Sequence, residues 1–219
     1  MRYYFKFIVY LYVLYGFSCA TAGSYEDYFA AILKDDVPVV SSLLERGFDP
    51  NTPNPAGDRA LLIALRVGST KVIPVLLAQP KLDVEARNRQ DESALMIASL
   101  KGMTDMASLL LDKGADVNKP GWTPLHYAAT GGHLQIMQLL LDNHAYIDAA
   151  SPNGSTPLMM AAMYGTPSAV KLLLEAGADP LLKNELGLTA IDFAQRANRK
   201  ESVDIIAAFV RGRQPRGQW

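Results

Sequence analysis

The chain has 219 residues, of which 49% are hydrophobic and 20% are charged. This composition excludes a largely disordered chain and allows one domain with a substantial core. Because 21 basic residues are balanced by 22 acidic ones, no excess of positive charge points to nucleic acid or to an acidic membrane surface as the partner.

Residues 1–22 differ from the rest of the chain and have the order of a secretory signal. Arg2 and Lys6 precede an apolar run over residues 7–17, and small residues follow at 18–22. The apolar run is shorter than the roughly 20 residues that cross a bilayer. We therefore predict cleavage after Ala22, with membrane contact only through this segment. An uncleaved anchor is the alternative, because the segment contains several tyrosines.

Cys19 is the only cysteine and lies inside this predicted signal. Cleavage after Ala22 would leave a mature chain without cysteine. Disulfide bonds and thiol catalysis are then excluded from the mature protein.

A pattern repeats in the second half of the chain at intervals of 33 residues. Similar strings begin at residues 121, 154 and 187, and read Gly-Trp-Thr-Pro-Leu-His, Gly-Ser-Thr-Pro-Leu-Met and Gly-Leu-Thr-Ala-Ile-Asp. In the first two of these units, paired alanines and then three leucines follow at matching positions. This pattern resembles the ankyrin repeat, which has the same period and a Thr-Pro-Leu-His signature.

The resemblance implies an all-α fold, an ankyrin-repeat solenoid of about six helix-turn-helix units with short β-hairpin-like connections. The predicted domain covers residues 23–219. Its units, in chain order, are expected at about 24–56, 57–90, 91–120, 121–153, 154–186 and 187–211, with a basic tail over 212–219. The hairpin at Lys119 and Pro120 must be about three residues shorter than the others. The first and last units are expected to be caps, because a stack needs polar ends.

Local physical rules explain the residues that recur. Threonine caps the first helix of a unit and proline is tolerated at its first position. The paired alanines let helices approach closely, and the leucine triplets are expected to bury the second helix. Glycines at the turn between the two helices are expected to adopt a left-handed conformation, which costs glycine least. These glycines are Gly68, Gly102, Gly132 and Gly165.

Catalytic and metal chemistry would have to use the three histidines, His126, His133 and His144. The resemblance implies that His126 bonds backbone between turns, that His133 begins a second helix and that His144 replaces a glycine. Their spacing is not that of a compact metal site, and no nucleophile turn or phosphate loop is present. We therefore predict no enzyme activity, no cofactor, no metal and no small-molecule substrate.

The resemblance implies a binding surface on the hairpin tips and on the concave face, which includes the ends of the first helices, where side chains are not required by the core. The candidate residues are mostly apolar, and large exposed apolar patches often mark interaction sites. They are Leu100, Lys101, Trp122, Met163, Tyr164, Leu186 and Leu188. Alternatively, Trp122 packs over the short hairpin. A second candidate is the basic carboxy end from Arg196 onward, as a solvated cap or as a contact for an acidic partner.

The predicted function is a non-enzymatic adaptor, monomeric, that binds an unidentified protein partner. Cysteine-free ankyrin proteins with a signal segment resemble a bacterial periplasmic group, so a periplasmic location is expected, with an extracellular one as the alternative. The alternative function is a secreted effector or inhibitor that acts on a foreign protein. Fold alone does not select between them.

Overall fold

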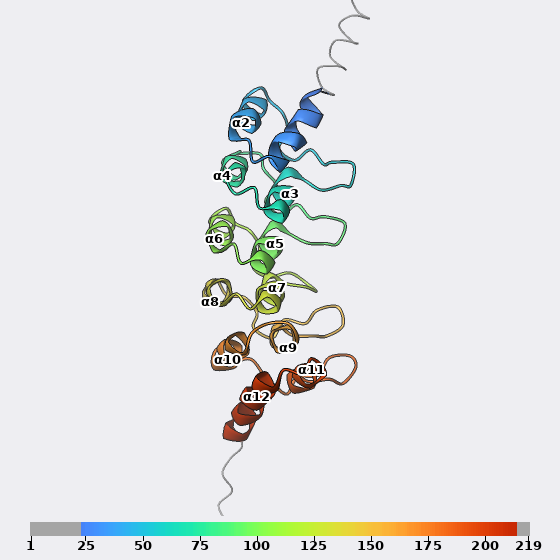
Figure 1. Cartoon of the computed structure of the whole chain (residues 1–219), viewed down its shortest axis with the longest axis vertical. Coiled ribbons are helices and arrows are strands. Elements are labelled where there is room, and N and C mark those ends of the chain that lie inside the picture. The colour runs from blue at the N-terminus through green and yellow to red at the C-terminus, as the bar shows by residue number, and fades with distance from the viewer. Residues whose placement is uncertain (1–22, 214–219) are drawn as a thin grey trace, which may run out of the picture. The chain divides into compact units, whose positions relative to one another are not determined.

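The computed structural model describes residues 23–213, and this part of the chain is helical (Figure 1). The predicted signal segment and residues 214–219 lie outside the described residues. Within residues 23–213 no strand forms, and one isolated bridge joins Pro53 and Arg59. The prediction of an all-α fold with short hairpin-like connections is confirmed.

The chain divides into two compact units, and the first reaches to Arg89. It contains helical residues 23–33, α2 (Val37–Glu45), α3 (Ala60–Val67) and α4 (Val72–Leu77). α4 packs against both α2 and α3. The core of this unit includes fully buried large side chains, among them Tyr28, Ile32, Leu62, Leu65, Ile73 and Leu76.

The second unit begins at Gln90 and is built as two rows of helices. α5 (Ala94–Lys101), α7 (Pro124–Gly131), α9 (Pro157–Met163) and α11 (Ala190–Arg196) form one row. α6 (Thr104–Asp112), α8 (Leu134–Asp142), α10 (Pro167–Glu175) and α12 (Lys200–Arg213) form the other. The loops that lead into α7, α9 and α11 project on the same side (Figure 1).

Two helices of the first row, α7 and α9, begin as the Thr-Pro pattern predicts. The hydroxyl of Thr123 accepts from the backbone N–H of His126 at 3.5 Å, and the next residue, Pro124, opens α7. Thr156 caps α9 in the same way at 3.4 Å. Each cap satisfies one of the N–H groups that a helix start leaves without a partner.

The turn glycines divide into two kinds. Gly68, Gly102 and Gly132 have φ values of 85°, 72° and 68°, so the predicted left-handed conformation is confirmed. For Gly165 it is wrong, because this residue does not have a positive φ. A Cβ on Gly165 would lie 2.4 Å from the carbonyl oxygen of Ala129, so glycine is required there for close approach to the preceding repeat.

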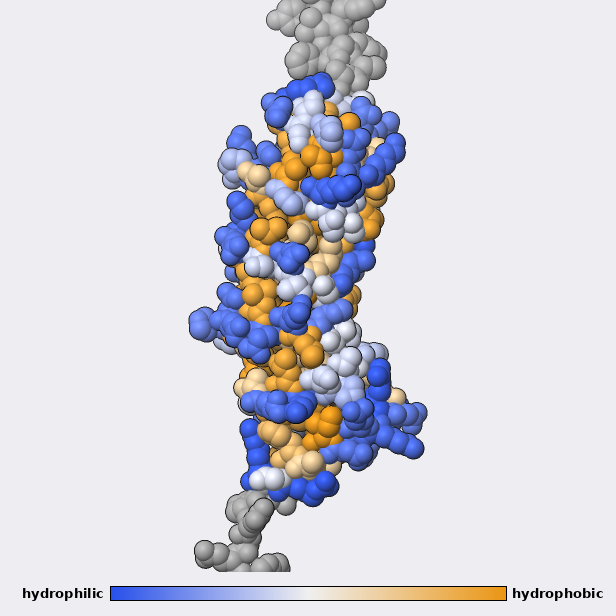
Figure 2. All heavy atoms as spheres, turned by 60° about the vertical axis from the view of Figure 1, so that its left-hand side comes forward, coloured by the Kyte–Doolittle hydropathy of each residue, from blue (hydrophilic) through white to orange (hydrophobic). Residues whose placement is uncertain are grey.

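The leucine triplets are only partly buried. In α6, Leu110 is completely buried, whereas Leu109 is 37% exposed. Figure 2 shows apolar side chains that reach the surface between hydrophilic ones. The triplets thus bury one side of the second helices but not every leucine, because successive residues of a helix point about 100° apart. In α10, Leu173 and Leu174 are both buried.

Asn118 joins successive turns of the second unit. Its Oδ1 accepts from the backbone N–H of Tyr146 at 2.8 Å, and its Nδ2 donates to the carbonyl oxygen of His144 at 2.9 Å. We expect Asn118→Ala to lower the free energy of unfolding by about 1–2 kcal/mol, because both backbone groups lose their partner. Urea unfolding provides the measurement. Asn143→Ala is the control, with an effect below about 0.5 kcal/mol, since Asn143 bonds only within its own helix.

Candidate functional site

The histidine of the repeated signature, His126, is completely buried and holds two turns together. Its Nδ1 accepts from the backbone N–H of Thr123 at 3.2 Å, so the neutral ring carries its hydrogen on Nε2. Nε2 then donates to the carbonyl oxygen of Ser155 at 2.9 Å. Burial lowers the pKa of His126 to about 4, although backbone carbonyls oppose part of this shift. The predicted bond between turns is confirmed.

The other two histidines also take the places that the resemblance implies. His133 stands at the start of α8, and its Nε2 lies 2.9 Å from the carbonyl oxygen of Leu100. His144 has a φ of 66°, the conformation that a glycine adopts most easily. Over residues 23–213 no group of three His, Cys, Asp or Glu side chains is placed to hold a metal ion.

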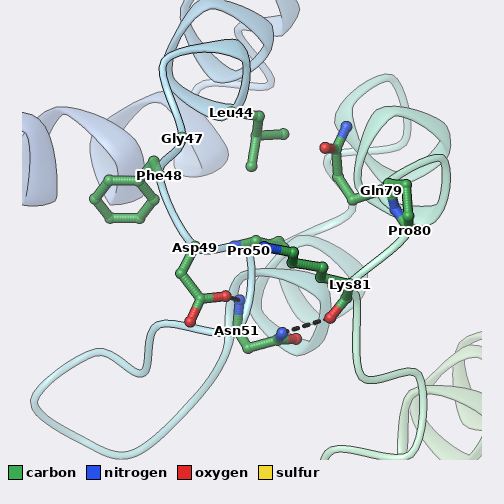
Figure 3. A pocket seen from close by; sticks show the side chains of 9 residues that line it. All are labelled: Leu44, Gly47, Phe48, Asp49, Pro50, Asn51, Gln79, Pro80 and Lys81. Atoms are coloured by element: carbon green, nitrogen blue, oxygen red, sulfur yellow. Dashed lines mark hydrogen bonds between the residues drawn. The ribbon is translucent and has the colours of Figure 1, made fainter.

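A hollow of about 520 Å³ lies in the first unit between the end of α2 and the end of α4 (Figure 3). Asn51 crosses it, because its Nδ2 donates to the carbonyl oxygen of Lys81 at 2.7 Å and its Oδ1 accepts from the N–H of Asp83 at 2.8 Å. Asp49 in turn accepts from the N–H of Asn51 at 2.9 Å. The nine lining residues include no Ser, Thr, Cys or His, so they supply neither a nucleophile of these types nor an imidazole base. Through the hydrogen bonds of Asn51, the hollow instead joins the turn after α2 to the turn after α4.

The predicted surface residues fall into two groups in the second unit. Leu100 and Lys101 end α5, and Met163 and Tyr164 end α9, so these four lie at the carboxy ends of first-row helices. Trp122, Leu186 and Leu188 lie on the loops that precede α7 and α11. A helix of seven or eight residues is about 11 Å long, and this length separates the two groups.

Exposure differs among these residues. Leu100, Tyr164 and Leu186 are 40%, 51% and 75% exposed, and Lys101 is also exposed. Met163 and Leu188 are half-buried. Large side chains are therefore open to solvent at both ends of the first-row helices.

Trp122 is half-buried and uses part of its ring for packing. The ring lies edge-on to the imidazole of His126, with centroids 5.2 Å apart and an angle of 78° between the planes. Beside it, the side chain of Lys119 is only 6% exposed and forms an ion pair with Asp91. The ion pair between Lys119 and Asp91 therefore links the short hairpin to the loop before α5, and part of the indole remains exposed to solvent.

The first unit exposes apolar residues that were not among the predicted site residues. Leu33 and Val67 are 59% and 51% exposed. With Phe29 and Ile63 they line a hollow of about 230 Å³. Leu33 and Val67 lie at the end of the first helix of their repeats, as Leu100 does. The first repeat lacks the Thr-Pro turn that would have aligned Leu33 with the others.

Comparison with known protein families agrees with the stacked helix pairs. The family model described as ankyrin repeats (three copies) matches residues 28–120, 82–151, 118–184 and 148–213. The chain belongs to the ankyrin repeat family. Among the helices that the structure describes, none is both long and apolar enough to cross a membrane.

Curated ankyrin relatives share only a segment with this chain. Protein fem-1 homolog A-like from Mus musculus is 36% identical over 137 residues, which are 61% of this chain and 21% of that protein. The B-cell lymphoma 3 protein homolog from Mus musculus is 32% identical over 153 residues, 67% of this chain and 34% of that protein. The chain thus spans about a third or less of these two relatives' length.

A solved structure is similar over most of the chain. It is described as the predatory endopeptidase Bd0816 from Bdellovibrio bacteriovorus in complex with immunity protein Bd3460. The match has a TM-score of 0.73 and 28% identity, and covers 83% of this chain and 97% of the matched chain. Ankyrin repeats serve protein binding, and here they form nearly the whole described chain.

Proposed function

We propose that this ankyrin-repeat protein is a non-enzymatic adaptor that binds one protein partner through the exposed ends of its first-row helices and its hairpin tips. The exposure of Leu100 and Tyr164 carries the proposal. Both are large side chains that remain 40% and 51% exposed, while other side chains of the two rows form the buried core of the second unit. Such residues anchor interfaces, where burying an aromatic ring stabilises a complex by several kcal/mol.

The binding test uses the full chain as bait in a periplasmic extract of the cells that produce it. Trp122→Ala and Tyr164→Ala should each weaken retention of the partner about tenfold, because each removes an aromatic anchor. Tyr146→Ala is the matched control, since Tyr146 is 69% exposed but belongs to neither group of candidate residues. Retention that is unchanged by both test variants would contradict the proposed face.

The proposed location is the periplasm, with secretion from the cell as the alternative. The basic, apolar and small-residue order of residues 1–22 supports it. The protein recovered from the periplasm of a Gram-negative host should be a monomer with the mass of residues 23–219. Replacing Ala20 and Ala22 by lysine should leave the uncleaved mass, because the signal peptidase needs small side chains at these positions. A wild-type chain that keeps residues 1–22 would instead indicate an anchor.

An inhibitor is the second candidate, and the similarity to a chain of an endopeptidase–immunity protein complex favours it. In this case the partner is an enzyme whose active site the ankyrin surface covers. The two candidates differ in the turnover of the purified partner. An inhibitor abolishes that turnover at an equimolar ratio, whereas an adaptor binds and leaves it unchanged.

A further inference from the structure

Four consecutive turns of the second unit are joined into one edge. These turns connect first-row to second-row helices, and we call them the turn edge: residues 100–104, 130–134, 163–167 and 196–200. His133 reaches back to the carbonyl oxygen of Leu100 at 2.9 Å, and Arg199 donates to the carbonyl oxygen of Tyr164 at 3.2 Å. Between them, Gly132 approaches Thr166 so closely that a Cβ would lie 2.7 Å from its methyl group. Each turn therefore contacts the next.

The charge of the turn edge differs from that of the chain as a whole. Its four basic residues are Lys101, Arg196, Arg199 and Lys200, and its sequence contains no Asp or Glu. Within residues 23–213 none of these cations forms an ion pair. The nearest carboxylates in sequence are Asp105, Glu201 and Asp204 on the second-row helices and Asp192 on α11. Hydrogen bonds from Thr189 lower the pKa of Asp192, and the attraction between Asp192 and Arg196 helps to lower it. The turn edge is thus a basic strip on a chain whose overall charge is nearly balanced.

The surface shape of the turn edge suits the binding of an extended peptide segment. Thr130, Gly131 and Gly132 leave a low saddle, because their side chains are small or absent and His133 folds over Gly131 toward Leu100. The other large side chain of that turn, Leu134, begins α8 and is 38% exposed. Exposed Leu100 stands on one side of the saddle and exposed Tyr164 on the other. The cations lie beyond them at both ends. Apolar contact in the centre with charges around it is the arrangement of a specific protein interface.

We propose that the turn edge binds an extended acidic segment of the partner protein, which carries apolar side chains among its carboxylates. This inference rests on the proposed function and specifies the chemistry of the partner. Charge complementarity supports it, since four cations outside any ion pair attract carboxylates and reject a basic partner. A structural explanation also exists for Lys101 and Arg196, because cations are favoured at the carboxy ends of α5 and α11.

A defined peptide tests the proposal without knowledge of the partner. The probe is a fluorescein-labelled 12-residue peptide with six glutamates, two leucines and one tyrosine, and its twin has glutamine in place of each glutamate. Fluorescence anisotropy with the full chain should show at least tenfold tighter binding of the acidic peptide, with the difference reduced by added salt. Equal binding of both peptides, or binding of neither, would overturn the proposal.

Two charge-matched triple variants locate the site. K101E/R196E/K200E should weaken binding of the acidic peptide at least tenfold, whereas K113E/K183E/R211E, with the same change of net charge on exposed residues outside the turn edge, should change it less than twofold. Equal losses in both variants would mean that only bulk charge matters. If the first variant lowers Tm but not the affinity for the acidic peptide, the cations only stabilise the carboxy ends of the helices and the proposal is wrong.

The outcome is separable from that of the proposed function. A bait that still retains its partner through Trp122 and Tyr164, but does not distinguish the two peptides, refutes the acidic segment and leaves the protein-binding function standing. A bait that retains nothing, but binds the acidic peptide at the turn edge, refutes the proposed function in that extract and leaves the chemistry of the turn edge intact.

Discussion

Acidification from pH 7 to pH 4 is expected to lower the free energy of unfolding of the second unit by about 3 kcal/mol through His126 alone. The pKa of this residue is about 4 in the folded protein, against the 6.5 of a solvent-exposed histidine in an unfolded chain. The unfolded chain therefore binds more protons between these two values, and stability rises with pH across this window. The contribution is complete above pH 6.5 and is lost as the pH falls toward 4.

One hydrogen bond of His126, the bond that its Nδ1 accepts from Thr123, opposes protonation as burial does, whereas the bond to the carbonyl oxygen of Ser155 favours it. A second proton would have to go on Nδ1, the atom that accepts from the N–H of Thr123. Protonation would thus place two donors face to face inside the core, where neither could reach water. The folded state opposes protonation for both reasons.

Urea unfolding at pH 7, 5.5 and 4 tests this prediction. Trp122 lies edge-on to His126, so its fluorescence, recorded in a Trp219→Phe background, reports local unfolding. His126→Gln should be less stable than the wild type at pH 7 but should lose much of the pH dependence. His133→Gln is the control, because His133 also bonds a backbone carbonyl but is only half-buried. A wild-type slope that survives in His126→Gln would contradict the assignment.

Gly165→Ala is expected to lower the free energy of unfolding by about 2 kcal/mol, the usual cost of forcing a methyl group into a packed site. The new Cβ would lie 2.4 Å from the carbonyl oxygen of Ala129 and 3.0 Å from the Cα of Ala161. Both are backbone atoms, so no side-chain rotation relieves the contact. α7 and α9 would have to move apart.

Gly212→Ala is the control for this substitution. Gly212 lies within α12 and has nothing within 4 Å of the position of a Cβ. Alanine has the higher helix propensity, so this variant should be as stable as the wild type or more stable by about 0.5–1 kcal/mol. If thermal unfolding shows that Gly165→Ala is no less stable than Gly212→Ala, close approach is not the reason for glycine at 165.

The sequence by itself determined the features that depend on neighbouring residues. Thr123 and Thr156 were predicted to cap helices and do so, because a cap needs only a side chain three residues from an N–H. Gly102 and Gly132 adopt the expected left-handed conformation, and His126 bonds the next turn as the repeat pattern implies. The 33-residue period and the Thr-Pro-Leu-His signature showed the resemblance to the ankyrin repeat, and that resemblance predicted the all-α fold. The boundaries of the six repeats and the role of the candidate surface residues remain predictions.

Only the tertiary structure decided which side chains meet across repeats. The sequence showed Gly165 at the same place as the turn glycines, but its reason is a carbonyl oxygen 36 residues earlier, on Ala129. Leu109 and Leu110 are adjacent and chemically identical, and helix rotation alone leaves Leu109 37% exposed and Leu110 completely buried. The turn edge likewise depends on contacts such as that between Arg199 and Tyr164. A period reveals that units stack, but the atoms in contact depend on the angle and spacing of the stack, which packing sets.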